Sequence, residues 1–208
     1  AQTRGFSHWL DQQRKRAWAP LPDTAIPRDV ADLTLTVLGL GAIGSEFARL
    51  ARGLGFRVIG VRRSPRRDDD PIDELCPPER LDRILPETDW LVIACPLTDQ
   101  TRGLIDGSKL ALLPAGARVA NVARGEVIVE EALVAALRAG RLAGAYLDVF
   151  ATEPLPADSP LWDLPGVWVS PHNSSLSQGN FDREAKIFLA NLTRFGRGEP
   201  LLNQVVGD

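Results

Sequence analysis

A glycine-rich segment between two periodic patterns constrains the fold of this chain more than any other feature. An apolar run starts at Leu33 and ends at Leu38, and Gly39, Gly41 and Gly44 then form the pattern G-x-G-x-x-G. Apolar residues at helical spacing follow directly: Phe47, Leu50, Ala51 and Leu54. The predicted order is therefore strand, tight turn and helix.

Each glycine of this turn has its own task in a dinucleotide site. Gly39 can adopt the turn dihedral angles, Gly41 lets a pyrophosphate approach the backbone, and Gly44 lets the helix pack closely on the strand. The helix start at Ala42 and Ile43 offers unpaired N–H groups and a positive dipole end to phosphates. The segment predicts dinucleotide binding; the alternative is a glycine turn that serves packing alone.

Length and composition exclude several classes of protein. The 208 residues have room for one large α/β domain or two small ones, and the net charge of −3 argues against a general nucleic-acid surface. The basic run at 14–16 is expected to be a solvated helix end. No apolar stretch reaches the roughly 18 residues of a membrane span, and no signal-peptide pattern opens the chain. Cys76 and Cys95 lack metal-ligand spacing, which predicts no metal site, no disulfide scaffold and a cytoplasmic location.

Strand-like and helix-like patterns alternate along the chain. They predict strands at 33–38, 57–61, 90–94, 117–122, 143–149 and 167–170. They predict helices at 1–18, after the glycine turn, once within 71–88, around 129–137 before a Gly140 cap, and at about 179–196. This alternation gives an α/β fold with a doubly wound parallel sheet of the Rossmann type, whose ligand lies at the carboxyl ends of the strands. The expected divisions are a helix and linker at 1–27, a dinucleotide-binding domain at 28–175 and a C-terminal helix segment at 176–208.

The loop after the second predicted strand indicates which dinucleotide is bound. In NAD sites an acidic residue usually binds the ribose 2′-hydroxyl from this position. Arg62 stands there instead, and Arg63 and Ser64 follow it. A guanidinium can bind a 2′-phosphate bidentately, whereas an acid would repel it. The loop therefore predicts NADP(H), bound by these three residues. The alternative is an exposed loop whose arginines pair with the acids at 68–70.

Three further segments place chemically active side chains at the ends of predicted strands. Arg124 lies in N-V-A-R-G, Glu153 in D-V-F-A-T-E-P, and His172 in P-H-N-S. The other histidine, His8, is expected on the surface of the N-terminal helix. A single histidine after a strand is more often structural, but an arginine, a glutamate and a histidine in one crevice indicate catalysis.

These segments, in this order, resemble the D-isomer-specific 2-hydroxyacid dehydrogenases. The match runs from residue 1 to about 205 and includes G-L-G-A-I-G, C-P-L-T-D-Q-T-R, N-V-A-R-G, L-D-V-F-A-T-E-P-L-P and S-P-H-N-S. The resemblance implies that Arg124 binds the carboxylate of a 2-oxo acid, that His172 exchanges the proton, and that Glu153 bonds the other imidazole nitrogen. A neighbouring carboxylate favours a protonated imidazole, which suits a proton donor.

The resemblance also implies the remaining cofactor contacts. Asp148 would lie near the nicotinamide and orient it. The other contacts would come from Cys95, Pro96, Thr101, Val122, Ala123 and Ser174, with Arg124 and His172 also touching the cofactor.

The chain departs from the family pattern in three places. Ala94 stands where the family often has a histidine without a catalytic role. Val129 stands where a helix usually begins with a capping Asp, which should weaken that cap by about 1 kcal/mol. The family's substrate domain, most of which precedes the first helix, is expected to be missing.

The resemblance implies a function and a partner. The expected activity is NADPH-dependent reduction of a small 2-oxo acid such as glyoxylate or hydroxypyruvate, because G-V-R-R-S resembles the loop of the reductase-like branch. NAD(H) is the alternative cofactor. Alternative functions on the same fold are a dinucleotide-sensing protein resembling the C-terminal-binding corepressors and a phosphite or formate dehydrogenase. The family dimerises through this domain, so we expect a homodimer, and we expect the two terminal helices to expose apolar surface.

Overall fold

The computed structural model describes residues 4–22 and 26–204, and it divides them into two compact units, Ala1–His172 and Asn173–Asp208. The predicted positions 1–3 of the first helix and 23–25 of the linker lie outside the described residues. The first unit contains a seven-stranded, fully parallel sheet with the order β3-β2-β1-β4-β5-β6-β7. The doubly wound Rossmann-type sheet predicted from the sequence is therefore confirmed.

The strands follow the apolar runs of the sequence. They are β1 (Thr34–Leu38), β2 (Arg57–Val61), β3 (Glu74–Cys76), β4 (Trp90–Ile93), β5 (Ala117–Asn121), β6 (Leu142–Leu147) and β7 (Val167–Val169). In β1, β2 and β4 every residue after the first is buried, as a parallel strand covered on both faces requires. The sheet order reverses direction between β1 and β4, so the switch point lies where the glycine turn leaves β1.

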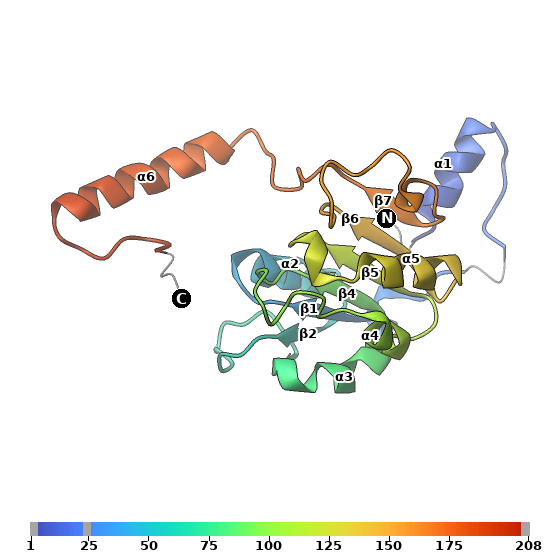
Figure 1. The fold of residues 1–208 in the computed structure, drawn as a ribbon, viewed down its shortest axis with the longest axis horizontal. Helices are drawn as coiled ribbons and strands as arrows, with labels where there is room; N and C mark the ends of the chain where they lie inside the picture. Colours follow the sequence, from blue (N-terminus) through green and yellow to red (C-terminus); the bar gives the residue numbers. More distant parts are fainter. Residues whose placement is uncertain (1–3, 23–25, 205–208) are drawn as a thin grey trace. The chain divides into compact units, whose positions relative to one another are not determined.

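The helices cover the sheet unequally. They are α1 (Phe6–Arg14), α2 (Ala42–Gly53), α3 (Leu81–Ile84), α4 (Gly107–Leu112), α5 (Glu130–Arg138) and α6 (Asn180–Gly196), and Figure 1 shows their arrangement. One apolar cluster joins the sheet to α3, α4 and α5, and a smaller cluster on the other face joins it to α2. No helix among the described residues is long and apolar enough to cross a membrane.

The apolar pattern of α2 does not face the sheet as its spacing suggests. The side packed on the sheet consists of small residues, Gly44, Ala48 and Ala51. Large apolar residues of the same helix lie exposed on its outer side: Ile43, Phe47, Leu50 and Leu54. A surface of small residues lets the helix axis approach the strands closely, so the large residues are excluded from that side. The outer residues form an apolar stripe, which we call the α2 stripe.

Two short elements were not predicted from the sequence. β3 and α4 have three and six residues, too few to produce a readable period. α4 does carry a local start signal, because the Asp106 side chain accepts the backbone N–H of Lys109. The sequence predicts that α5 begins at Val129 without a capping side chain. This is confirmed, since Val129 occupies the N-cap and makes no side-chain bond to the helix.

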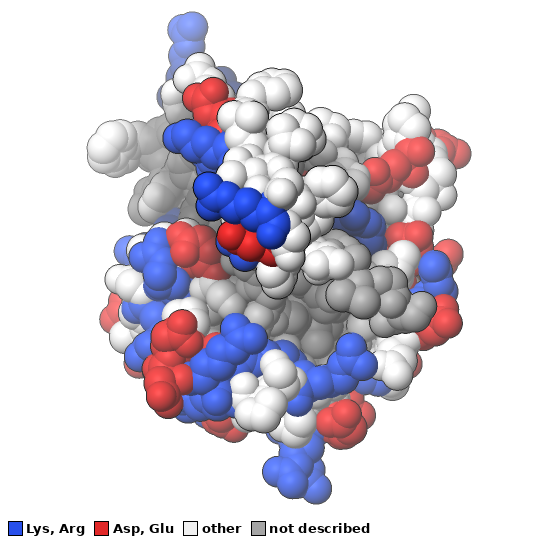
Figure 2. All heavy atoms as spheres, turned by 90° about the vertical axis from the view of Figure 1, so that its left-hand side faces the viewer, with Lys and Arg blue, Asp and Glu red and all other residues white. Residues whose placement is uncertain are grey.

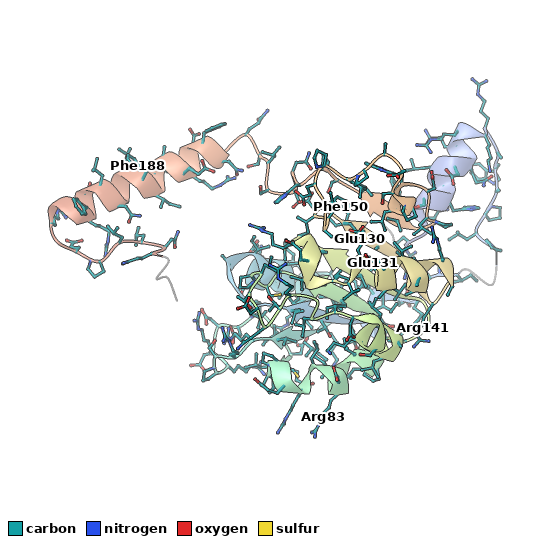
Figure 3. The ribbon with its side chains drawn as sticks, viewed as in Figure 1. Arg83, Glu130, Glu131, Arg141, Phe150 and Phe188 are labelled. Carbon is teal, nitrogen blue, oxygen red and sulfur yellow. The ribbon has the colours of Figure 1, made fainter. Side chains whose placement is uncertain are left out.

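The two terminal helices differ in how they are held. α1 contacts the edge of the sheet, where Phe6 meets Trp168 edge to face at 6.2 Å and Trp168 Nε1 donates to Ser7 Oγ at 3.0 Å. α6 forms the second unit and has no buried residue. Its exposed apolar side chains include Phe181, Phe188 (labelled in Figure 3), Leu192 and Phe195. The terminal helices thus expose apolar residues, as the sequence predicts.

Candidate active site

The glycine turn has the close packing that its sequence predicts. Gly39 has a φ of 99°, and a Cβ there would lie 2.6 Å from the backbone of Cys95. A Cβ on Gly44 would lie 1.8 Å from the carbonyl oxygen of Gly39. In contrast, a Cβ on Gly41 would enter open space, and this residue is the N-cap of α2 without a side-chain bond to the helix. The turn therefore leaves an uncovered approach to the first N–H groups of α2.

The loop after β4 borders this approach. Cys95 is buried against the glycine turn, where burial raises the pKa of its thiol and the side chain packs as an apolar residue. Thr101 closes the loop on itself: its Oγ1 donates to Pro96 O at 2.7 Å and accepts from Thr98 N at 2.8 Å. The structure thus gives Thr101 a bracing role in a loop predicted to contact the cofactor.

Arg124 is presented by a tightly packed turn after β5. Asn121 is buried, and its side chain accepts from Ala123 N and donates to Arg124 O. A Cβ on Gly125 would lie about 2 Å from the backbone of Phe150, which follows β6. The turns after β5 and β6 therefore pack backbone to backbone, and the exposed Arg124 side chain lies at that edge.

Glu153 and His172 form a hydrogen-bonded pair on the same edge. Glu153 Oε2 lies 2.8 Å from His172 Nδ1, and Glu153 Oε1 accepts from Phe150 N at 3.0 Å. The pKa of Glu153 lies below its usual range, chiefly because of the bond to His172 and also because of the Phe150 N–H and the nearby Arg124. An ionised carboxylate therefore fixes Nδ1 as a donor.

The backbone of His172 adopts an unusual conformation. Its φ is 50°, which costs a non-glycine residue about 1–2 kcal/mol. The His172 N–H donates to Asp148 O at 2.8 Å, which ties this residue to the end of β6. Within the described residues Nε2 has no hydrogen-bond partner, and about half of the side chain is exposed. The imidazole is thus oriented at Nδ1 and available at Nε2.

A buried network orients Asp148. This residue is 1% exposed, and its Oδ1 accepts from Ser170 Oγ at 2.5 Å. Tyr146 OH lies 2.8 Å from the same Ser170 Oγ. The carboxylate is therefore fixed at the carboxyl end of β6, beside the segment that carries His172.

A hollow of about 520 Å³ adjoins the Glu153–His172 pair. Its other lining residues are mainly apolar: Phe150, Pro154, Leu155, Trp162, Val169 and Pro171. Figure 3 shows Phe150 on the segment next to the start of α5, where Glu130 accepts the Ala151 N–H. An apolar wall beside a charged pair lowers the local dielectric constant and strengthens the hydrogen bond between them.

Arg62, at the end of β2, is engaged within its own loop. Its guanidinium contacts both carboxylate oxygens of Asp70, at 2.7 and 2.6 Å, and the two side chains are 9% and 5% exposed. For Arg62 the structure therefore shows pairing with an acid of 68–70, the alternative that the sequence left open. Arg63, Ser64 and Arg67 are exposed in the same loop.

Comparisons with known proteins agree with this arrangement. Residues 1–174 match the model of a family described as D-isomer specific 2-hydroxyacid dehydrogenase, NAD binding domain. This match covers most of the chain. The chain belongs to that family. The resemblance stated from the sequence motifs is therefore confirmed.

Individual relatives are reductases of this family. The chain is 37% identical over 195 residues to glyoxylate reductase of Korarchaeum cryptofilum, covering 92% of this chain and 58% of the relative. It is 36% identical over 203 residues to glyoxylate/hydroxypyruvate reductase A of Klebsiella pneumoniae, covering 97% and 62%. The chain thus spans about three fifths of the length of these relatives.

Solved structures of the family have the same fold. A 2-hydroxyacid dehydrogenase of Xanthobacter autotrophicus Py2, in complex with NADPH and MES, superposes with a TM-score of 0.86 at 39% identity, covering 98% of this chain and 81% of that one. An NADPH-dependent glyoxylate/hydroxypyruvate reductase of Sinorhizobium meliloti, in complex with NADP and sulfate, has a TM-score of 0.86 at 32% identity, covering 98% and 63%.

The first unit brings together most of the predicted site residues. They lie on the glycine turn and on the loops after β2, β4, β5, β6 and β7, all at the carboxyl edge of the sheet. Ser174 belongs to the second unit and is not placed relative to this edge. No role was predicted from the sequence for Asn121 or Ser170, because each acts through a hydrogen bond that no spacing reveals. The sequence offered Asp70 only as one of three acids at 68–70 that could pair with the arginines.

Proposed function

We propose that this chain is the cofactor-binding and catalytic part of an NADPH-dependent reductase of small 2-oxo acids. The observation that carries the proposal is the Glu153–His172 pair, oriented at Nδ1 and available at Nε2, at the same sheet edge as an open glycine turn. The reductase names of the relatives support the class of substrate. Glyoxylate and hydroxypyruvate are the substrates we favour.

The residues at the switch point fit a dinucleotide. The open space at Gly41 and the first N–H groups of α2 suit a pyrophosphate, and the closed contacts at Gly39 and Gly44 hold the turn in that shape. When bound, the reduced nicotinamide supplies a hydride. We assign its orientation to Asp148, which is buried and bonded by Ser170, and the walls of its site to Cys95, Pro96 and Val122. The cytoplasm, where NADPH is abundant, is the proposed location.

We propose divided roles for the three polar residues at the catalytic edge. Arg124 binds the carboxylate of the 2-oxo acid by charge-assisted hydrogen bonds and lies near the carbonyl oxygen. His172 delivers a proton from Nε2 to that oxygen and accepts it back in the reverse direction. Glu153 holds Nδ1 and stabilises the positive charge of the imidazolium.

The preference for NADPH rests on the loop after β2. We propose that exposed Arg63 and Ser64 contact the 2′-phosphate. For Arg62 we propose a supporting role in place of a direct contact, because its guanidinium is bonded to both carboxylate oxygens of Asp70. Arg63 Nη1 lies 3.5 Å from Gln100 of the loop after β4, so its side chain reaches toward the switch point. The face in Figure 2 carries basic side chains gathered beside acidic ones.

We propose that residues 28–175 form the cofactor-binding domain, flanked by segments 1–27 and 176–208, and that two copies associate. The exposed α2 stripe supports a homodimer, because a contiguous apolar surface usually marks an interface. Sedimentation equilibrium tests this association. A sample that stays monomeric at micromolar concentration would rule it out.

A substrate panel tests the activity directly. The protein that carries this sequence should oxidise NADPH with glyoxylate or hydroxypyruvate, and should reduce NADP⁺ only weakly with phosphite or formate. Turnover with phosphite or formate alone would move the chain to that branch. Binding of NADPH without turnover of any acid would favour a dinucleotide-sensing role.

A further inference from the structure

The loop 62–73 is organised around one buried ion pair. Arg62 donates Nε to Ser64 O at 3.2 Å, Nη2 to Pro65 O at 2.5 Å, and both Nη atoms to Asp70. Four of the five N–H donors of a guanidinium are thereby used inside the loop. Arg62 cannot in this conformation present the paired donors that a phosphate needs.

Both carboxylate oxygens of Asp70 are hydrogen-bonded within the same loop. Its Oδ2 also accepts the Arg67 N–H at 2.7 Å, so one carboxylate joins the start and the end of the arginine run. The pKa of Asp70 lies below its usual range, mainly because of the Arg62 hydrogen bond and then the Arg67 N–H. The acid is therefore ionised, and the pair leaves no excess charge beneath the loop.

The pair separates the arginines into two groups. The Arg62 side chain is buried. The Arg66 guanidinium donates to two backbone carbonyl oxygens of the loop, Ile72 O at 2.8 Å and Asp73 O at 3.0 Å. Arg63 and Arg67 point outward from the braced segment and are exposed. The seven residues between Arg62 and Asp70 would otherwise sample many conformations, and ordering them on phosphate binding would cost conformational entropy.

We propose that Asp70 is a specificity-determining positioning residue: paired with Arg62, it fixes the loop in the conformation that presents Arg63 and Ser64 to the 2′-phosphate of NADPH. This inference rests on the proposed function. Asp70 touches no cofactor atom. Its effect is pre-organisation, because a loop already ordered spends less of its binding free energy on ordering.

Two opposite effects are possible when the Asp70 carboxylate is neutralised. If only charge mattered, removal of a negative charge near the phosphate would strengthen NADPH binding. We expect weaker binding instead, because Arg62 loses its partner and the loop is no longer held in one conformation. Asp69 is the matched control, since it is an exposed aspartate in the same loop and Asp69→Asn changes the charge equally.

The test compares dissociation constants of NADPH and NADH for the 208-residue chain and its variants, by nicotinamide fluorescence. Asp70→Asn should weaken NADPH binding roughly tenfold, the equivalent of one charge-assisted hydrogen bond, and leave NADH within about twofold. Asp69→Asn should leave NADPH unchanged or slightly tighter. Without cofactor, Asp70→Asn should also make the loop a faster trypsin substrate after Arg63 and Arg67, and Asp69→Asn should not.

The double variant Arg62→Gln/Asp70→Asn keeps the proposal falsifiable if a lone buried Arg62 prevents folding, because it leaves no unpaired charge. Relative to wild type, it should weaken NADPH binding roughly tenfold and leave NADH binding within about twofold. A loss of NADPH affinity well beyond tenfold would show that Arg62 contacts the phosphate itself, and this result or unchanged NADPH binding would overturn the proposal. Unchanged or tighter NADPH binding by Asp70→Asn would overturn it as well. If the wild-type chain binds both dinucleotides equally, the proposed cofactor fails together with this inference, a result distinct from the other two.

Discussion

Each end of the site pairs a carboxylate with a basic side chain, and the two pairs differ in burial. In the loop after β2, Arg62 and Asp70 are almost fully buried and bind each other through two bonds. At the catalytic edge, Glu153 and His172 share one bond and stay 35% and 48% exposed. Buried charges must be satisfied within the protein, so they shape the backbone. The half-exposed His172 is bonded only at Nδ1 and keeps Nε2 available for a ligand. Burial of both partners therefore marks the Arg62–Asp70 pair as a positioning device, and exposure leaves His172 able to act.

Removal of the His172 imidazole, and with it Nε2, should have the largest effect on turnover. His172→Ala should lower reductive turnover by roughly 10²- to 10⁴-fold, the usual contribution of a general acid. The dissociation constant of NADPH should change by less than about threefold. Steady-state kinetics and a fluorescence titration provide the two values. Near-normal turnover would remove His172 from the mechanism.

The next largest effect concerns the close packing of the glycine turn, measured as a change in the free energy of unfolding. Gly44→Ala places a Cβ against the carbonyl oxygen of Gly39 and should destabilise the chain by about 3 kcal/mol or prevent folding. Gly53→Ala is the control on the same helix, because a Cβ there meets nothing within 4 Å. It should be neutral or stabilising by up to about 1 kcal/mol. Urea denaturation compares the two; equal stabilities would mean that the turn is not tightly packed.

Loss of the orienting carboxylate should have a moderate effect. Glu153→Gln keeps the size of the side chain but removes the charge opposite Nδ1, so turnover should fall roughly tenfold or more while NADPH binding persists. Glu131→Gln, on the exposed start of α5, is the control. Equal turnover of the two variants would argue against a catalytic role for the Glu153–His172 pair.

The smallest effect concerns stability at acid pH. The pKa of Asp70 is lowered in the folded chain, so its ion pair stabilises the fold above the unfolded pKa of about 3.9 and loses this contribution as pH falls below it. The difference in unfolding free energy between wild type and Asp70→Asn should therefore be largest near neutral pH and shrink below about pH 4. A difference independent of pH would show that the carboxylate charge is not involved.

Much of this structure follows from the sequence for identifiable reasons. Continuous apolar runs predicted β1, β2 and β4, because strands buried on both faces need no alternation. The spacing of motifs predicted that Arg124, Glu153 and His172 share one edge, since parallel strands end together.

The rest depends on contacts that spacing does not encode. The outward α2 stripe was missed because small residues can form the buried side of a helix. The partner of Arg62 was offered only as an alternative, because sequence gives the nearby acids without showing which one is buried with it.

One titration shows whether this sheet edge binds NADP(H) through a loop built for a 2′-phosphate. Nicotinamide fluorescence measures the dissociation constants of NADPH and NADH at about 20 and 200 mM salt. We expect NADPH to bind at least tenfold more tightly than NADH at low salt, and we expect this difference in affinity to shrink at high salt because exposed charges are screened. Equal affinities, or tighter binding of NADH, would contradict it.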